Sequence, residues 1–309
     1  MIRYIIRRIL FLIPVLIGVA FCVFTLLYLT PGDPARMVLG DMATEEAIEE
    51  FRVKEGLDKP FLAQFGNYLY KAVRYGDIGR SYITKRPVMQ EIMAAFPATL
   101  KLSAFAIVIA IAIGLPCGIL SAIKQYSIFD TITMIFAMVG LSMPVFWLGL
   151  LLILYFSVHL RWLPSSGFDT FAAMILPSLA LSAQSISMIT RMTRSSMLEV
   201  VRADYIRTAR SKGQKESVVI WVHALHNALI PVVTLCGLQF GHLLAGAILT
   251  ESIFAIPGVG RLMVESIKMR DYPMVQGGVL FVAVAFSVVN LLVDLVYAYI
   301  DPRIKAQYK

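Results

Sequence analysis

Basic side chains concentrated between residues 191 and 216 are the part of this sequence best suited to binding chemistry. Seven arginines and lysines lie there with only three acids, Glu199, Asp204 and Glu216. Guanidinium and ammonium groups at this density attract either the carboxylates of a partner protein or anionic lipid headgroups. The spacing alone leaves both readings open. The basic residues are Arg191, Arg194, Arg202, Arg207, Arg210, Lys212 and Lys215.

The same segment has the pattern of an amphipathic helix. At about 100° per residue, one face carries Leu198, Val201, Tyr205 and Ala209. The opposite face carries Glu199, Ala203, Arg207, Arg210 and Ser211. No glycine or proline interrupts residues 198–212, so a rigid helix is predicted from Leu198 to a stop at Gly213. Such a helix serves either as a docking surface or as a helix lying in the headgroups.

Catalytic chemistry is not predicted anywhere in the chain. His223 and His226 are three residues apart, but the glutamate of an H-E-x-x-H zinc motif is missing. Neither G-x-S-x-G nor the phosphate-binding loop G-x-x-x-x-G-K-[ST] occurs. Cys22, Cys117 and Cys236 have no metal or disulfide spacing and are interpreted as small buried apolar side chains. No enzyme activity, resident metal or bound cofactor is therefore expected.

The composition is that of a membrane protein. The 309 residues are 58% hydrophobic and 16% charged, whereas soluble domains are about 45–50% apolar and about 25% charged. The net charge of +8 comes from bases clustered at the ends of apolar runs. That placement favours membrane orientation over nucleic-acid binding, which is not expected.

Six apolar runs have the length of roughly 20 residues or more that a membrane-spanning helix requires. Pro144 in the third run and Pro177 in the fourth are expected sites of a kink. The predicted fold is therefore an all-α integral membrane protein with six transmembrane helices. The runs are Ile9–Thr30, Ala98–Ile123, Thr131–Leu160, Phe171–Ile189, Leu229–Phe254 and Val275–Tyr299.

Charge places both termini in the cytoplasm. Arg3, Arg7 and Arg8 precede the first run, and Arg303, Lys305 and Lys309 follow the sixth. Residues 31–97, with ten acids and nine bases, then lie outside. The predicted divisions are 1–30 (cytoplasmic end and first span), 31–97 (extracytoplasmic), and 98–309 (a five-helix core with a cytoplasmic loop at 191–228).

The external segments contain short helices of their own. Thr44 with two glutamates after it predicts a capped helix through Glu55 that stops at Gly56. A second helix is predicted around Phe61–Tyr75, and a turn with a short helix in 255–274.

Polar side chains inside the spans are candidates for a translocation path, because they are costly in lipid and face a bundle interior or a pathway. The alternative is hydrogen bonding between helices. The candidates on the fourth and fifth spans are Gln184, Ser187, Gln239, His242, Thr250 and Glu251.

A resemblance covers nearly the whole chain. Its motifs run in order from PGDPA after the first span to YIDPRI at the end. The chain resembles the first-type membrane permease of the dipeptide, oligopeptide and nickel ABC importers of bacteria and archaea. Further motifs that carry the resemblance are GRSYITKRPV at 79–88, PATLKLS at 97–103, SMPVFWLG at 142–149, DYIRTARSKG at 204–213, HALHNALIPVVT at 223–234 and ESIFAIPGVGRL at 251–262.

The resemblance implies the type I ABC importer permease fold and a role for the basic loop. In that family the loop holds the EAA motif, whose coupling helix inserts into a groove on the ATPase. Here Ala209 and Gly213 match the motif, while Arg207 and Thr208 stand where the general pattern has Glu and Ala. The implied coupling residues are Glu199, Asp204, Tyr205, Arg207, Thr208, Ala209, Arg210 and Gly213.

The resemblance also implies that the chain lies in the cell (inner) membrane and works with several partners. They are a second homologous permease, one or two P-loop ATPases that bind ATP and magnesium, and an extracytoplasmic binding protein. The expected cargo is di- or oligopeptides. A nickel chelate or glutathione is the alternative within the same architecture, and an ion-coupled secondary transporter is the remoter one.

Overall fold

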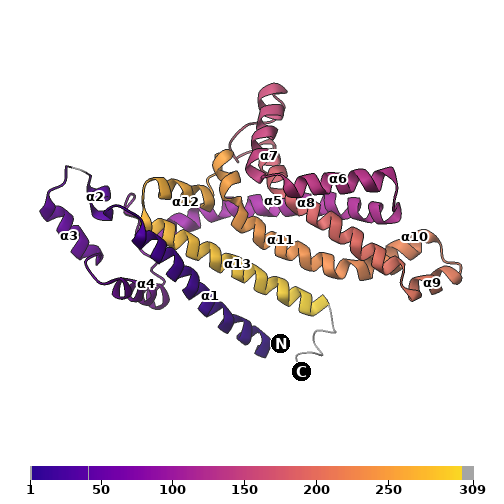
Figure 1. The fold of residues 1–309 in the computed structure, drawn as a ribbon, viewed down its shortest axis with the longest axis horizontal. Helices are drawn as coiled ribbons and strands as arrows, with labels where there is room; N and C mark the ends of the chain where they lie inside the picture. Colours follow the sequence, from indigo (N-terminus) through magenta and orange to yellow (C-terminus); the bar gives the residue numbers. More distant parts are fainter. Residues whose placement is uncertain (1, 41, 301–309) are drawn as a thin grey trace. The chain divides into compact units, whose positions relative to one another are not determined.

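The computed structural model describes residues 2–40 and 42–300, and its regular elements are helices (Figure 1). Within these residues the only β pairing is an isolated bridge between Arg80 and Pro87. The predicted all-α fold is confirmed. Arg303, Lys305 and Lys309, which entered the orientation argument, lie outside the described residues.

The helical elements follow one another along the described residues. In chain order they are α1 (Ile2–Leu29), α2 (Pro34–Leu39), α3 (Glu45–Glu55), α4 (Phe61–Tyr75), α5 (Val88–Ile123), α6 (Ile128–Ser142), α7 (Val145–Leu152), the π-helical η1 (Ile153–His159), α8 (Phe171–Val201), α9 (Asp204–Ser211), α10 (Glu216–Val218), the π-helical η2 (Val219–Ala224), α11 (Leu225–Ile253), α12 (Val259–Lys268) and α13 (Tyr272–Ile300).

The described residues contain five helical stretches that are long and apolar enough to cross a membrane. A sixth span results if α6 and the continuous α7–η1 pair count as one broken span, bent by 107°. The bend falls at Pro144, as predicted, because proline has no N–H for the preceding turn and instead begins α7. Pro177, in contrast, lies inside an unbroken α8.

Several of the spans, α5 and α8 among them, are longer than a bilayer needs. α5 has 36 residues, which at 1.5 Å per residue is about 54 Å, against a hydrocarbon core of about 30 Å. It begins ten residues before the predicted span, within the 31–97 segment. α8 continues twelve residues past the predicted end of its span, so much of the 191–228 loop is helical.

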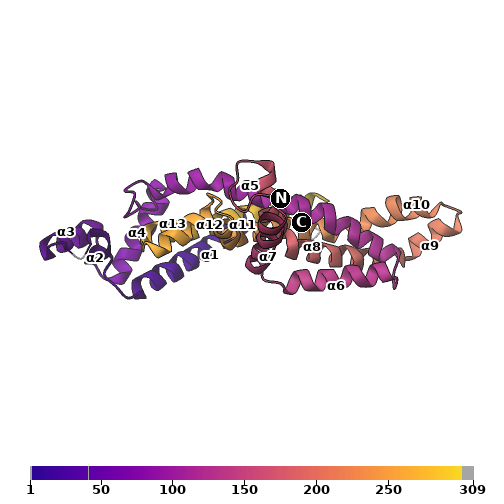
Figure 2. The same cartoon turned by 90° about the horizontal axis from the view of Figure 1, so that it is seen from above.

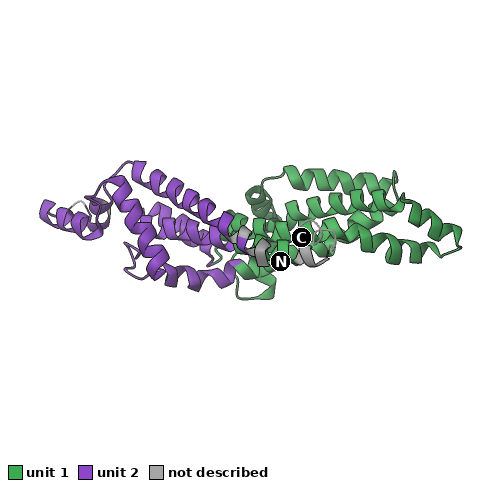
Figure 3. Ribbon diagram, turned by 90° about the horizontal axis from the view of Figure 1, so that it is seen from below, with its two compact units in different colours: residues 1–5, 100–256, 286–309 green, residues 6–99, 257–285 purple. Residues whose placement is uncertain are grey.

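The chain divides into two compact units, shown in different colours in Figure 3. Unit 1 consists of residues 1–5, 100–256 and 286–309, and unit 2 of residues 6–99 and 257–285. The 31–97 segment therefore shares a unit with most of α1, with α12 and with the first half of α13.

In unit 1, α8 is the central helix, and α6 runs along it in both views (Figures 1 and 2). Glycines permit the close packing. A Cβ on Gly118 of α5 would lie 2.6 Å from the Thr190 carbonyl oxygen, and one on Gly140 of α6 would lie 2.6 Å from the Ser187 hydroxyl. Small residues at such contacts let helix backbones approach in a membrane protein.

In unit 2, aromatic side chains join α1 to α4. The rings of Tyr28 and Phe24 lie 5.1 and 5.4 Å from Phe61 in edge-to-face geometry, which is a favoured aromatic arrangement. The helices predicted here are confirmed. Thr44 caps α3 by accepting from the Ala47 amide, Gly56 ends it in the left-handed region, and α4 and α12 form as expected.

The three cysteines are free. Cys117 and Cys236 are half-buried, whereas Cys22 on α1 is exposed. The prediction of burial is wrong for Cys22, because only 6% of the apolar stretch of α1 is buried within the chain.

Candidate coupling helix and translocation pocket

The basic segment forms two helices rather than one. α8 ends at Val201, Ala203 adopts extended backbone with φ −67° and ψ 150°, and α9 begins at Asp204. The prediction of a single helix over 198–213 is therefore wrong. Its end is close to the prediction, since α9 stops at Ser211 and Gly213 has φ +75°, a conformation that glycine adopts readily.

Ile206 explains the break. Its exposed fraction is 0%, and it packs in one apolar cluster with Met197 of α8 and Val219 and Ala224 of η2. The extended backbone at Ala203 separates α9 from α8, and α9 buries Ile206 in that cluster. We infer that burial of this side chain outweighs the helix propensity of the segment. The pattern analysis missed Ile206, which lies between a tyrosine and an arginine.

The rest of α9 remains accessible. Ala209 packs against the apolar cluster, as its predicted face requires. Tyr205 was placed on the same face but is exposed, and its hydroxyl accepts a hydrogen bond from Asn227 Nδ2 at 2.9 Å. Arg207 is 74% exposed and lies 3.7 Å from Asp204, an exposed contact that contributes little stability. Thr208 is exposed as well, and Glu199 is exposed on α8.

Arg210, another predicted coupling residue, forms a two-point ion pair inside the chain. Its guanidinium donates to both carboxylate oxygens of Glu216, at 2.6 and 3.1 Å. This hydrogen bonding raises the pKa of Arg210 above its ordinary value. The pair closes the turn between α9 and α10, so Arg210 fixes the shape of the loop in addition to carrying charge.

Arg194, counted among the basic residues of the loop, is an ion-pair partner within the bundle. Its Nε and Nη2 atoms donate to the two carboxylate oxygens of Asp130 at 2.7 and 2.8 Å. The same carboxylate also accepts from the Ser121 hydroxyl and from the Tyr126 amide at 3.0 Å. The side chain of Asp130 is only 5% exposed. Arg194 therefore joins α8 to α6 and to the α5–α6 turn.

Three of the six path candidates meet in one pocket of unit 1. Gln184, Gln239 and His242 line a cavity of about 380 Å³ between α7, α8 and α11. Gln239 Nε2 lies 2.7 Å from the sulfur of Met188, a weak acceptor, and the His242 ring lies 5.8 Å from Phe286. The pocket thus has two amides and an imidazole set among apolar side chains.

The other three candidates do not line that pocket. Ser187 lines a separate cavity, and its hydroxyl donates to the Ala183 carbonyl at 3.0 Å. Thr250 and Glu251 are buried near the end of α11. Hydrogen bonding within the bundle is sufficient to explain Ser187.

Family models account for almost the entire chain. Residues 114–306 match "Binding-protein-dependent transport system inner membrane component", and residues 1–103 match "Binding-prot-dependent transport system membrane comp, N-term". The chain belongs to this family of permeases. It is the first-type membrane permease subunit of an ABC importer.

Curated relatives agree over the full length of the permease. A protein of Alkalihalophilus pseudofirmus named "Dipeptide transport system permease protein DppB" is 47% identical, over 99% of this chain and 100% of its own length. "Glutathione transport system permease protein GsiC" of Pectobacterium atrosepticum is 48% identical, over 99% of both chains.

Solved structures support the fold of the permease at low sequence identity. An inward-facing structure of the MetNI methionine ABC transporter has a TM-score of 0.56 at 17% identity, covering 69% of this chain and 97% of that one. An amino acid ABC transporter with histidines gives 0.53 at 16% identity, over 70% and 94%. The shared architecture is the ABC importer permease fold.

Proposed function

We propose that α9 is the helix through which ATPase subunits act on this permease. The observation that carries the proposal is that α9 has one side chain buried in the bundle and several exposed. Ile206 is fully buried in the bundle, while Tyr205, Arg207 and Thr208 on the same helix are exposed. A helix that transmits motion must be fixed to the element that it moves and accessible to the element that drives it, and α9 meets both conditions.

The proposed coupling region also includes residues at the end of α8, in α9 and in the turn after it. They are Glu199, Asp204, Ala209, Arg210 and Gly213. Asp204 begins α9, and Arg210 with Glu216 holds the turn that follows it. Gly213 provides the left-handed residue at which the chain reverses. The exposed guanidinium of Arg207 is suited to a carboxylate on the ATPase surface.

We propose that the pocket lined by Gln184, Gln239 and His242 faces the translocation path. Its amides and imidazole can exchange hydrogen bonds with peptide groups without fixing a particular side chain. The proposal that residues face the path is weaker for Ser187, Thr250 and Glu251, because they lie outside this pocket. A second homologous permease would supply the other half of the path.

The proposed cargo is a di- or oligopeptide or a peptide-like compound such as glutathione. The names of the two relatives, dipeptide and glutathione permeases at 47% and 48% identity, support this class over a nickel chelate. In this proposal both termini of the permease are cytoplasmic, the ATPases bind ATP and magnesium, and a binding protein delivers cargo on the opposite face.

The test is uptake by proteoliposomes that hold the complete transporter. Labelled dipeptide should accumulate when ATP is supplied on the ATPase side, and accumulation should survive a protonophore. Unlabelled dipeptide, glutathione and nickel salt are then compared as competitors. Uptake driven by a proton gradient without ATP would contradict the mechanism, and competition by nickel alone would contradict the cargo.

A further inference from the structure

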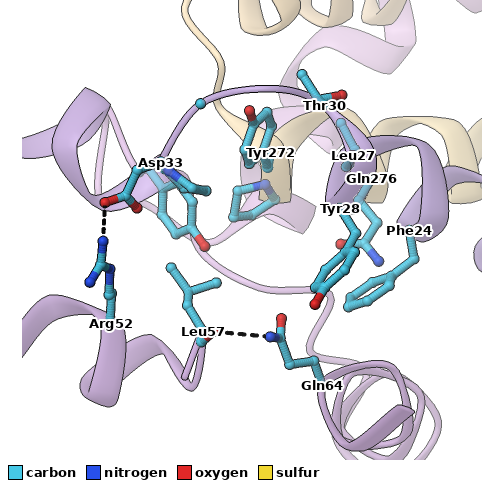
Figure 4. Close-up of a pocket in the computed structure, with 14 residues that line it drawn as sticks. Phe24, Leu27, Tyr28, Thr30, Asp33, Arg52, Leu57, Gln64, Tyr272 and Gln276 are labelled. Carbon is cyan, nitrogen blue, oxygen red and sulfur yellow. Dashed lines mark hydrogen bonds and ion pairs between the residues drawn. The ribbon is translucent and has the colours of Figure 1, made fainter. Parts of the chain in front are cut away.

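A second cavity lies entirely within unit 2, at the place where α1 ends and α13 begins. It has a volume of about 220 Å³ and is covered by side chains of α3, α4 and the loops beside them (Figure 4). Most of its lining is aromatic or aliphatic. Residues that matter for its chemistry are Phe24, Leu27, Tyr28, Tyr82, Tyr272 and Gln276.

Gln276 gives this cavity an unsatisfied hydrogen-bond donor. The residue is 8% exposed, and its Nε2 atom is buried with no hydrogen-bond partner among the described residues. The hydroxyl of Tyr272, one helical turn earlier, is also buried with no hydrogen-bond partner among the described residues. In Figure 4 Gln276 lies on the same side of the cavity as Phe24 and Tyr28. A buried donor without a partner is destabilising, so a ligand with an acceptor oxygen would relieve it.

The charged groups of the cavity already compensate each other. Arg52 Nη2 lies 2.6 Å from Asp33, and Arg52 Nη1 lies 3.0 Å from Glu49. The other Asp33 oxygen accepts from the Ala35 amide. The hydrogen bonds that the Arg52 guanidinium donates to Asp33 and Glu49 raise the pKa of Arg52, and burial raises the pKa of Tyr82. A ligand with a charged terminus would find no uncompensated counter-charge in the lining, so a neutral group fits best.

The position of the cavity relative to the apolar stretches favours a lipid as the neutral ligand. The apolar stretch of α1 ends at Leu29, and that of α13 begins at Tyr272, so the cavity lies at the boundary of the hydrocarbon region. The ester carbonyls of phospholipids lie at this depth, directly above their acyl chains. Tyr28, 53% exposed at the end of α1, is typical of an interfacial aromatic residue.

We propose that this cavity binds the acyl-ester portion of a phospholipid, with an ester carbonyl accepting from Gln276 Nε2 and the adjoining methylene groups packed on Leu27 and the aromatic rings. The bound lipid would fill the space between α1, α13 and the extracytoplasmic helices of unit 2. This inference does not depend on the cargo or on coupling through α9.

The experiment is photo-crosslinking of the complete transporter in nanodiscs with a phosphatidylglycerol that carries a diazirine near the ester end of one acyl chain. Labelled peptides are located by mass spectrometry. We expect labelling concentrated at residues 24–34 and 272–276. Gln276→Leu should lower it about fivefold, which corresponds to one neutral hydrogen bond.

Leu27→Trp, which fills the cavity, should abolish the labelling there. Leu26→Trp is the matched control, because Leu26 is 68% exposed and does not line the cavity. Leu27→Trp also keeps the test decisive if Gln276→Leu assembles poorly. Equal labelling at every lipid-facing helix end, or labelling unchanged by Leu27→Trp, would overturn the proposal. Stronger labelling of these residues by a diazirine dipeptide than by the lipid probe would overturn it as well.

Discussion

Arg194 on α8 and Arg207 on α9 have the same charge and lie in the same basic segment, but they belong to two regions with opposite roles. Arg194 donates two hydrogen bonds to a nearly buried carboxylate and joins α8 to α6. Arg207 is exposed and makes only a long contact with Asp204. The first arginine contributes to the fold, and the second is available to a partner.

The comparison shows that charge density in a loop does not measure the charge available for binding. Arg194 and Arg210 both have carboxylate partners inside unit 1. Fewer basic side chains are therefore available to a partner than the seven bases of the sequence suggest. If this distinction is right, changes at the first region should lower stability, and changes at the second should lower transport alone.

Arg194→Ala should have the largest effect on stability. It leaves the Asp130 carboxylate buried without its ion-pair partner, and breaking a buried pair costs about 3–5 kcal/mol. The measurement is thermal unfolding of the purified transporter in detergent. Arg191→Ala is the control, since Arg191 is exposed on the same helix. Equal melting temperatures for the two variants would mean that the Arg194–Asp130 pair does not stabilise the fold more than an exposed arginine does.

Ile206→Ala should have the next largest effect. Removing most of a fully buried isoleucine costs about 2–5 kcal/mol, and here the loss falls on the contact between α9 and the bundle. Hydrogen exchange should accelerate at 204–211 while α8 stays protected, and ATP-driven uptake should fall. Arg207→Ala, at an exposed neighbour whose ion pair lies within α9, should leave the exchange rates largely unchanged. Protection of α9 in the Ile206→Ala variant would mean that another contact holds the helix.

Gln239→Leu should alter stability by less than about 1 kcal/mol, because it removes a buried amide whose contact is a weak sulfur acceptor and retains similar volume. Uptake of dipeptide should nevertheless fall, with ATP hydrolysis continuing. Ser187→Ala, outside the pocket, provides the comparison. Normal uptake by the Gln239→Leu variant would contradict the proposal that this pocket faces the translocation path.

Arg207→Glu should have the smallest effect on stability, since an exposed ion pair contributes about 0–1 kcal/mol. Its effect on coupling should be large, with dipeptide uptake lost although the transporter still melts at the normal temperature. Lys124→Glu, the same charge reversal on the α5–α6 turn, should retain uptake. Loss of assembly or stability in Arg207→Glu would mean that Arg207, like Arg194, contributes to the fold.

Local signals in the sequence predicted a large part of this fold. Thr44 and Gly56 mark the ends of α3, Pro144 marks the bend in the third span, and Gly213 lies just after the end of α9. Each of these features depends on the backbone conformation of one residue and its neighbours, so they can be read without the tertiary structure.

Features that depend on distant residues were not predicted. The Asp130–Arg194 pair joins positions 64 residues apart, and the break at Ala203 depends on a cluster that includes residues of η2. For the same reason, polarity within a span identified Gln184, Gln239 and His242 but could not separate them from Ser187, Thr250 and Glu251. That separation requires knowing which faces of α8 and α11 border the pocket.

The most direct test of the central claim is crosslinking from α9. Cys22, Cys117 and Cys236 are replaced by alanine, one cysteine is introduced by Thr208→Cys or, as the control, by Lys124→Cys, and the assembled transporter is treated with a short cysteine-to-lysine crosslinker. We expect a covalent adduct between the permease and the ATPase from Thr208→Cys, strengthened by ATP binding, and little from the control. An adduct of equal yield from both positions, or none from Thr208→Cys, would contradict the assignment of α9 as the coupling helix.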